Sequence, residues 1–238
     1  MLKKAAVLCF IGSGLIANAA NEFVYNGIIY TPSGTKLTAK PYTTKVGGVQ
    51  VLTEPYSGDV VIESPVTIDG VTYTVTSVSN AFKGSNITSL YLPDDCITVS
   101  RAGLSECKYL TSVRLSPNMT TMPGNCFQKD SALVELSIPG GITQLKSNEL
   151  LGCISLKKLV LEEGSSTITF NISAFGSERS CPIEELVINR NVSAEAVAST
   201  PIRGLASLKK VTIGGACTAV PTSYFENCTA LETVEIGT

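Results

Sequence analysis

One short pattern recurs along the chain and constrains its fold more than any other feature. The pattern is an aliphatic residue, two variable residues, a second aliphatic residue, one variable residue and a third aliphatic residue. The last positions alternate as in a β-strand with one buried face, and such a strand cannot bury its face alone. We therefore expect the copies to stack in register. Seven copies, spaced 23, 23, 23, 27, 25 and 23 residues apart, begin at Ile87, Leu110, Leu133, Leu156, Ile183, Leu208 and Leu231.

These spacings lie in the range of leucine-rich repeats. The sequence therefore predicts a β-rich α/β leucine-rich-repeat solenoid over residues 75–238, right-handed, with a parallel sheet of about seven strands. Apolar residues such as Leu104 and Phe127 stand six positions before a copy begins. We expect short helical or 3-10 turns there, on the convex side. Asn26-Gly27 and Asp69-Gly70 are hairpin signals, so residues 21–74 are predicted to form an N-terminal β cap.

The repeat unit also resembles a particular family. Its form is Val-Thr-x-Val, then Ala-Phe, then x-x-Cys-x-x-Leu-x-x-Val-x-Ile-Pro, and the closest copies are 75–93, 142–161 and 220–236. Such units resemble the BspA-like leucine-rich-repeat surface proteins, and the resemblance covers about residues 71–238. It implies an exported or cell-surface protein of adhesin type, with no catalytic residues. The irregular units at 162–182 and 189–203 depart from the pattern.

The first residues are typical of a secretory signal. Lys3 and Lys4 precede an apolar run over 5–16, and Ala17-Asn18-Ala19 offers small residues for cleavage. The run is too short for a stable membrane anchor, and no later run is long and apolar enough to span a bilayer. We therefore predict a signal peptide at 1–20 and a protein at the cell surface or outside the cell.

Composition argues against catalysis. The chain has no histidine, which removes Ser-His and Cys-His nucleophiles and His-ligated metals. The pairs Asp94-Asp95, Glu162-Glu163 and Glu184-Glu185 are interpreted as solvated acids. A net charge of −2 gives no polybasic surface for nucleic acid or anionic membrane. We expect no enzyme activity, no metal and no cofactor.

The cysteines pose a separate question. Export favours disulfides, and seven of the eight cysteines follow residue 20. However, Cys107, Cys153 and Cys228 share one position of the repeat, as a core ladder would require. Cys107 and Cys153 would lie two coils apart, about 9–10 Å, which is too far for a bridge. Buried free thiols are therefore the favoured interpretation.

The exposed strand positions provide candidate ligand contacts. Glu135, Lys158, Glu185 and Lys210 should lie side by side with alternating charge. Tyr91 beside Arg114 is the best candidate contact pair, since both residue types are favoured at interfaces. The predicted ligand patch is Tyr91, Arg114, Glu135 and Lys158. The alternative is that these side chains only hold strand register and keep the sheet soluble. Five Asn-x-Ser/Thr sequons are explained by repeat preferences, at Asn86, Asn118, Asn171, Asn191 and Asn227.

Two functions follow from these features. The first is binding of an extracellular protein or glycan, without catalysis. The alternative is a structural envelope or matrix protein that self-associates through the open C-terminal end of its solenoid.

Overall fold

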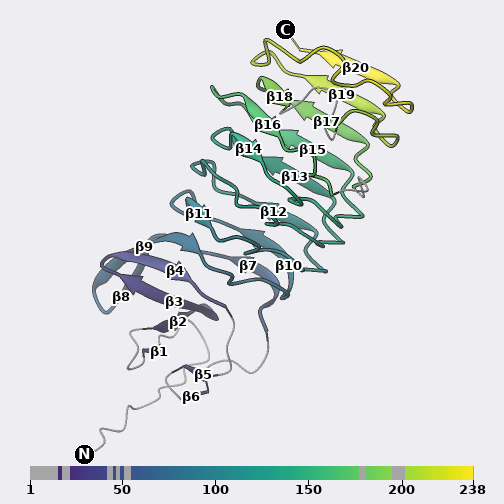
Figure 1. Cartoon of the computed structure of the whole chain (residues 1–238). Coiled ribbons are helices and arrows are strands. Elements are labelled where there is room, and N and C mark those ends of the chain that lie inside the picture. The colour runs from purple at the N-terminus through teal and green to yellow at the C-terminus, as the bar shows by residue number, and fades with distance from the viewer. Residues whose placement is uncertain are drawn as a thin grey trace, which may run out of the picture.

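The computed structural model describes residues 16–17, 22–41, 45–46, 49–50, 55–176, 181–194 and 202–237. Coils stack one upon the next from an N-terminal sheet to the C-terminal strand (Figure 1). The predicted signal peptide lies outside the described residues, apart from β1 (Ile16–Ala17), which pairs antiparallel with β2 (Phe23–Tyr25).

The main sheet is parallel and follows the repeat. Each of the seven copies supplies a strand at the expected residues, and Ser89 pairs with Ser112, and Glu135 with Lys158. This confirms the parallel solenoid. Hydrogen-bonded pairing divides the sheet into two groups. The groups adjoin at β12 and β13, which are neighbours in space. The first group is β7 (Ser57–Val61), β10 (Asn86–Tyr91) and β12 (Ser112–Arg114); the second is β13 (Glu135–Ile138), β15 (Lys158–Leu161), β17 (Glu185–Ile188), β19 (Lys210–Ile213) and β20 (Thr233–Ile236).

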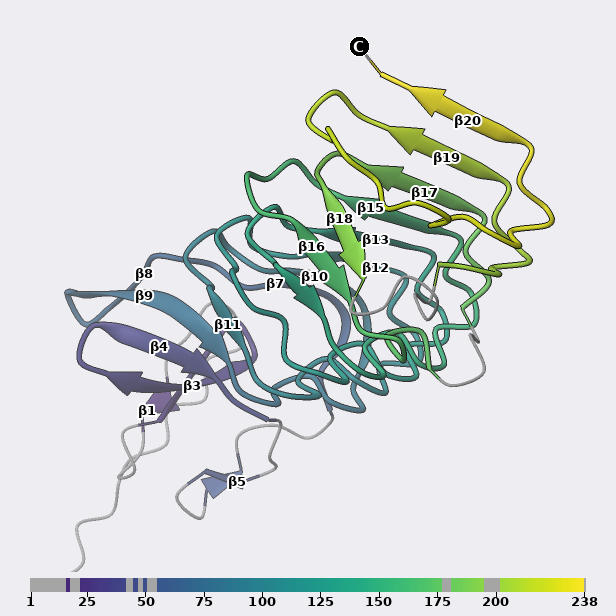
Figure 2. The same ribbon diagram turned by 45° about the horizontal axis from the view of Figure 1, so that its top comes forward.

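A second set of parallel strands, most of them short, pairs from coil to coil (Figure 2). Here β9 (Val71–Val78) pairs with β11 (Thr98–Val99), while β14 (Gln144–Leu145), β16 (Ile168–Phe170) and β18 (Val192–Ala194) pair in that order. We call these five strands the second ladder. The repeat pattern did not predict it, because β11, β14, β16 and β18 have only two or three residues each, too few to show an alternation.

The N-terminal region is β structure, as its hairpin signals indicate. β2 and β3 (Ile28–Ser33) are joined through Asn26 and Gly27, both with positive φ as a tight type I′ turn requires. β4 (Lys36–Ala39) and β8 (Val66–Ile68) flank β9, and β5 (Lys45–Val46) pairs with β6 (Val49–Gln50). β7 lies inside the segment predicted as a cap, yet it pairs in parallel with β10 and extends the main sheet.

The predicted helical or 3-10 turns on the convex side are not supported. No helix occurs in the described parts of the chain, which therefore hold none that could cross a membrane. The segments before the strands are hydrogen-bonded turns instead. Most of these segments have two residues with positive φ, four positions apart. They interrupt the right-handed backbone that a helix needs. They include Ala102 and Glu106, Asn125 and Lys129, Asn148 and Gly152, and Ser223 and Asn227.

One continuous core runs through the coils. Ile138 and Ile188 belong to the same fully buried cluster, as the stacking requires. Three fully buried ionisable residues interrupt the apolar ladders: Asp130, Glu149 and Arg190. Arg190 Nη1 donates to Gly140 O and Nη2 to Ile138 O, 3.4 Å away.

Candidate binding surfaces

A row of three side chains, two exposed and one half-buried, crosses the first group of the main sheet. Register places Val61 beside Tyr91, and Tyr91 beside Arg114. Val61 is 59% exposed and Tyr91 43%. The Arg114 guanidinium carbon lies 4.7 Å from the centre of the Tyr91 ring, a cation–π contact. Two predicted patch residues therefore meet, and Val61 joins them from a strand that sequence reasoning assigned to the cap.

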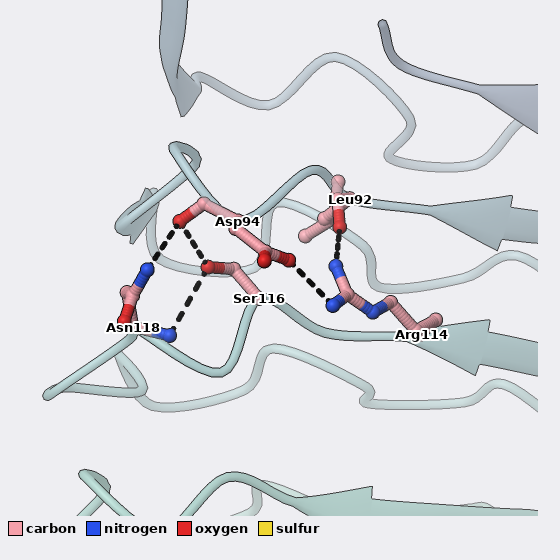
Figure 3. A network of polar contacts seen from close by, with 5 residues as sticks. All are labelled: Leu92, Asp94, Arg114, Ser116 and Asn118. Carbon is pink, nitrogen blue, oxygen red and sulfur yellow. Dashed lines mark hydrogen bonds and ion pairs between the residues drawn. The ribbon is translucent and has the colours of Figure 1, made fainter. Parts of the chain in front are cut away.

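Arg114 is held in place by the preceding coil (Figure 3). Its Nη1 donates to Leu92 O at 2.6 Å, and its Nη2 pairs with the Asp94 carboxylate. Ser116 Oγ donates to Asp94 O at 2.7 Å, and Asn118 Nδ2 donates to the same oxygen at 3.1 Å. The guanidinium therefore stays over the tyrosine ring without a ligand, and part of its hydrogen-bonding capacity is already used.

A shallow depression lies beside this row. It is lined by Val61, Tyr91 and Pro93 together with the carboxylates of Glu63, Asp94 and Asp95. Asp95 accepts a hydrogen bond from Ser64 Oγ at 2.7 Å. The surface around Tyr91 thus combines apolar contacts with negative charge. In the described residues, no group of three or more histidine, cysteine, aspartate or glutamate side chains is arranged to hold a metal ion.

The other two predicted patch residues form a separate pair. Glu135 and Lys158 are register partners, and Lys158 Nζ lies 3.6 Å from Glu135 Oε1. The predicted ladder continues in register through Glu185 and Lys210. Lys210, however, makes its ion pair with Glu235, 2.9 Å away on the next strand. Among the described contacts none joins this pair to Tyr91 and Arg114.

The structure has a second row of alternating charges that was not predicted from the sequence. Glu184, just before β17, accepts from Lys157 on one side and from Lys209, at 2.7 Å, on the other. These hydrogen bonds lower the pKa of the Glu184 carboxyl to about 2. The signal was present in the sequence, because Lys157, Glu184, Lys209 and Glu232 alternate in charge one position after each copy begins.

The thiols have a shared structural role. Of the seven described cysteines, all free, six are buried, and only Cys217 is partly exposed. Cys107 Sγ donates to Phe82 O at 2.9 Å and Cys153 Sγ to Phe127 O at 3.0 Å, each in the preceding coil. Burial raises the pKa of Cys107 to about 12, so this thiol stays protonated. The prediction of buried thiols is confirmed.

Two carboxyl groups, those of Asp130 and Glu149, are fully buried. Asp130 fills the repeat position that holds cysteine in other coils, and its Oδ1 accepts from Cys107 N at 2.8 Å. Glu149 Oε1 accepts from Cys126 N at 3.3 Å. Burial raises the pKa of each carboxyl to about 8. Sequence reasoning had only a weak signal for Asp130, which breaks the cysteine ladder, and none for Glu149.

The sequon residues at the turns bind neighbouring coils. Asn118 contacts Asp94 O, as described, and Asn191 Oδ1 accepts from Thr218 N at 2.7 Å and Ala219 N at 2.9 Å. Such bonds satisfy backbone groups that the turns leave unpaired. This accounts for asparagine at both positions without glycosylation.

Comparison with known proteins gives one family. A family model described as the BspA type leucine-rich repeat region matches residues 76–196 and 180–238, in six copies. No curated protein matches the chain.

Solved structures of repeat proteins are also similar. A leucine-rich repeat protein from Bacteroides capillosus is 26% identical over 51% of this chain and 85% of its own, with a TM-score of 0.44. The leucine-rich repeat protein of T. pallidum is 19% identical over 87% and 78%, with a TM-score of 0.50. The pneumococcal vaccine antigen PcpA is 17% identical over 94% and 50%, with a TM-score of 0.45. The T. pallidum protein shares the repeat fold.

Proposed function

The chain belongs to the BspA-type leucine-rich repeat family, and from this we propose that it is an exported, cell-surface or extracellular binding protein of adhesin type. Its partner would be an extracellular protein or glycan, and it would act without catalysis, cofactor or metal. The family match supports a repeat protein whose surface binds, and the basic, apolar start at residues 1–20 supports export.

One observation carries the proposed binding surface. Tyr91 and Arg114 lie stacked on the exposed face of the main sheet, and Asp94 and Leu92 O already fix the arginine. A side chain that is ordered before binding loses less conformational entropy on binding. Aromatic and arginine side chains also supply most of the energy at many interfaces. Val61, Tyr91 and Arg114 would form the centre of this surface, with Glu135 and Lys158 at its edge.

The experiment is an array of glycans and extracellular proteins, followed by variants on any partner found. Tyr91→Ala should weaken binding by about tenfold or more, since a central aromatic contact contributes more than about 1.4 kcal/mol. Arg114→Lys keeps the charge but loses the planar guanidinium, and it should also weaken binding.

Thr212→Ala, at the matching position of the distant strand β19, is the control and should leave affinity unchanged. A partner that binds all three variants as tightly as the natural chain would refute the assignment of this surface.

Self-association through the C-terminal coil stays a prediction. β20 exposes Val234 and Ile236, at 50% and 75%. Light scattering over a range of concentrations tests the alternative, because a protein that stacks through this coil would grow in mass with concentration.

A further inference from the structure

A polar groove lies at the carboxyl ends of the second ladder. Arg101 follows β11 by two residues, Lys146 directly follows β14, and Asn171 directly follows β16. Parallel strands point the same way, so residues after each strand meet along one edge. These three residues, with Pro123, Asn125 and Asn148, line a single groove.

The groove carries uncompensated positive charge. Arg101 and Lys146 are both exposed, and neither makes an ion pair with a described residue. No acidic side chain is among the described residues that line the groove. Glu149 is the acid next to it in sequence, and Lys146 lowers its pKa. Burial outweighs that effect and raises the pKa to about 8, so the carboxyl stays largely neutral at pH 7.

Two unengaged carboxamides line the same groove as the two cations. Asn125 and Asn148 occupy equivalent positions of successive coils, and within the described structure neither side chain is bonded to another group. Both have positive φ, but Ala102 and Ser223 fill the same left-handed position in other coils. The backbone therefore does not itself require asparagine. Each carboxamide offers a donor and an acceptor, as sugar hydroxyls do.

The spacing suits an elongated ligand. Successive coils rise by about 4.8 Å, so Asn125 and Asn148 present a repeated pair, and Arg101 and Lys146 lie about two coils apart. Asn171 closes one end of the groove, where its Oδ1 accepts from Ser147 Oγ at 2.9 Å and from Ser173 N at 3.0 Å.

We propose that this groove binds an anionic saccharide, with Arg101 and Lys146 pairing with carboxylate or sulfate groups and Asn125 and Asn148 hydrogen-bonding to hydroxyl groups. No aromatic platform for bases is among the described residues that line the groove, and two cations are too few for a nucleic-acid backbone. Pro123 is its main apolar side chain, so a peptide with apolar anchors would find no pocket there. The inference rests on the general binding role proposed above, but not on the Tyr91 surface.

The test measures binding of the full chain to three immobilised polymers: polygalacturonate, dextran sulfate and neutral dextran. We expect binding to at least one of the two anionic polymers, weakening as salt is raised, and none to dextran. The two anionic polymers distinguish carboxylate from sulfate as the recognised group. Arg101→Gln with Lys146→Gln should weaken binding by about tenfold or more.

Two controls separate a site from general charge attraction. Lys36→Gln with Lys108→Gln removes the same charge from exposed positions outside the groove and should change affinity by less than about twofold. Asn125→Gly with Asn148→Gly keeps the left-handed backbone accessible and the charge unchanged, and it should still weaken binding.

Four results would overturn the proposal: no binding to either anionic polymer at low salt, equal binding to dextran, equal losses for the two charge pairs, or no effect of the asparagine changes. Loss of polymer binding in Tyr91→Ala, with the groove variants unaffected, would instead locate the site on the main sheet. A protein partner found on the array, without polymer binding, would overturn this inference and leave the proposed binding function in place.

Discussion

This protein should lose stability as pH rises from about 4 to about 8, and replacing Asp130 with asparagine should make that loss smaller. Burial raises the pKa of Asp130 from 3.8 to about 8, and the negative charge of Glu106 adds to the effect. In the unfolded chain the carboxyl releases its proton near pH 4, whereas in the folded chain it keeps the proton until about pH 8. Between these values the folded state binds more protons, so the free energy of unfolding falls as pH rises.

The magnitude follows from this linkage. One proton bound in the folded state but not in the unfolded state lowers the free energy of unfolding by about 1.4 kcal/mol per pH unit. An asparagine side chain in place of Asp130 would keep an oxygen to accept the Cys107 N–H, now 2.8 Å from Oδ1, and has nearly the same volume. The free energy of unfolding of Asp130→Asn should therefore exceed that of the natural chain increasingly as pH rises from about 4 to about 8. The difference should reach a few kcal/mol near pH 8.

Urea unfolding followed by circular dichroism at a series of pH values measures this slope. Asp69→Asn, at an exposed hairpin turn, is the matched control and should run parallel to the natural chain. Glu149 titrates over the same window, so the variant should keep part of the slope, and adding Glu149→Gln should remove more. Parallel curves for Asp130→Asn and the natural chain would refute the reasoning.

Three further predictions concern charge and thiols. Lys158→Glu places three acids in neighbouring rungs, with Glu135 and Glu185, and should cost about 1 kcal/mol in urea unfolding at low salt and less at high salt; an unchanged midpoint at low salt would contradict it. Glu184 should titrate near pH 2 by NMR. Its contribution to stability is therefore present above about pH 4.5 and is lost as pH falls toward 2. Titration of Glu184 at the ordinary pH for glutamate would contradict its pairing with both lysines. Without reductant, thiol titration should find the six buried cysteines unreactive in the native protein and reactive in denaturant; three disulfides would contradict the thiol assignment.

The repeat pattern predicted those features of the fold that are fixed by the burial of aliphatic side chains. Strand positions, register and the shared core follow from aliphatic residues recurring every 23 to 27 residues, because any other register would expose them. The neighbours Tyr91 and Arg114 could be predicted for the same reason. The turns could not, since positive φ at Glu106 and Lys129 involves residue types that carry no left-handed signal.

The surfaces divide in the same way. Sequence alone could place Glu135 beside Lys158, but not decide that Lys210 pairs with Glu235 rather than Glu185. That choice depends on side-chain reach along the strands, which the repeat pattern does not fix. Val61 was not predicted because the repeat motif does not extend to β7, although the β7 backbone pairs with β10 and continues the main sheet.

Two buried ionisable residues, Arg190 and Asp130, show why polar groups of the core cannot be predicted from a repeat pattern. Arg190 is fully buried and donates to Gly140 O and Ile138 O, carbonyls about fifty residues earlier in the chain. A buried guanidinium is tolerated only where acceptors converge on it, and here they come from two coils before. Asp130 likewise replaces a thiol donor with a carboxyl that accepts from the coil before it. Each group is defined by backbone atoms in other coils, so its role follows from the stacked structure and not from the residues beside it in sequence.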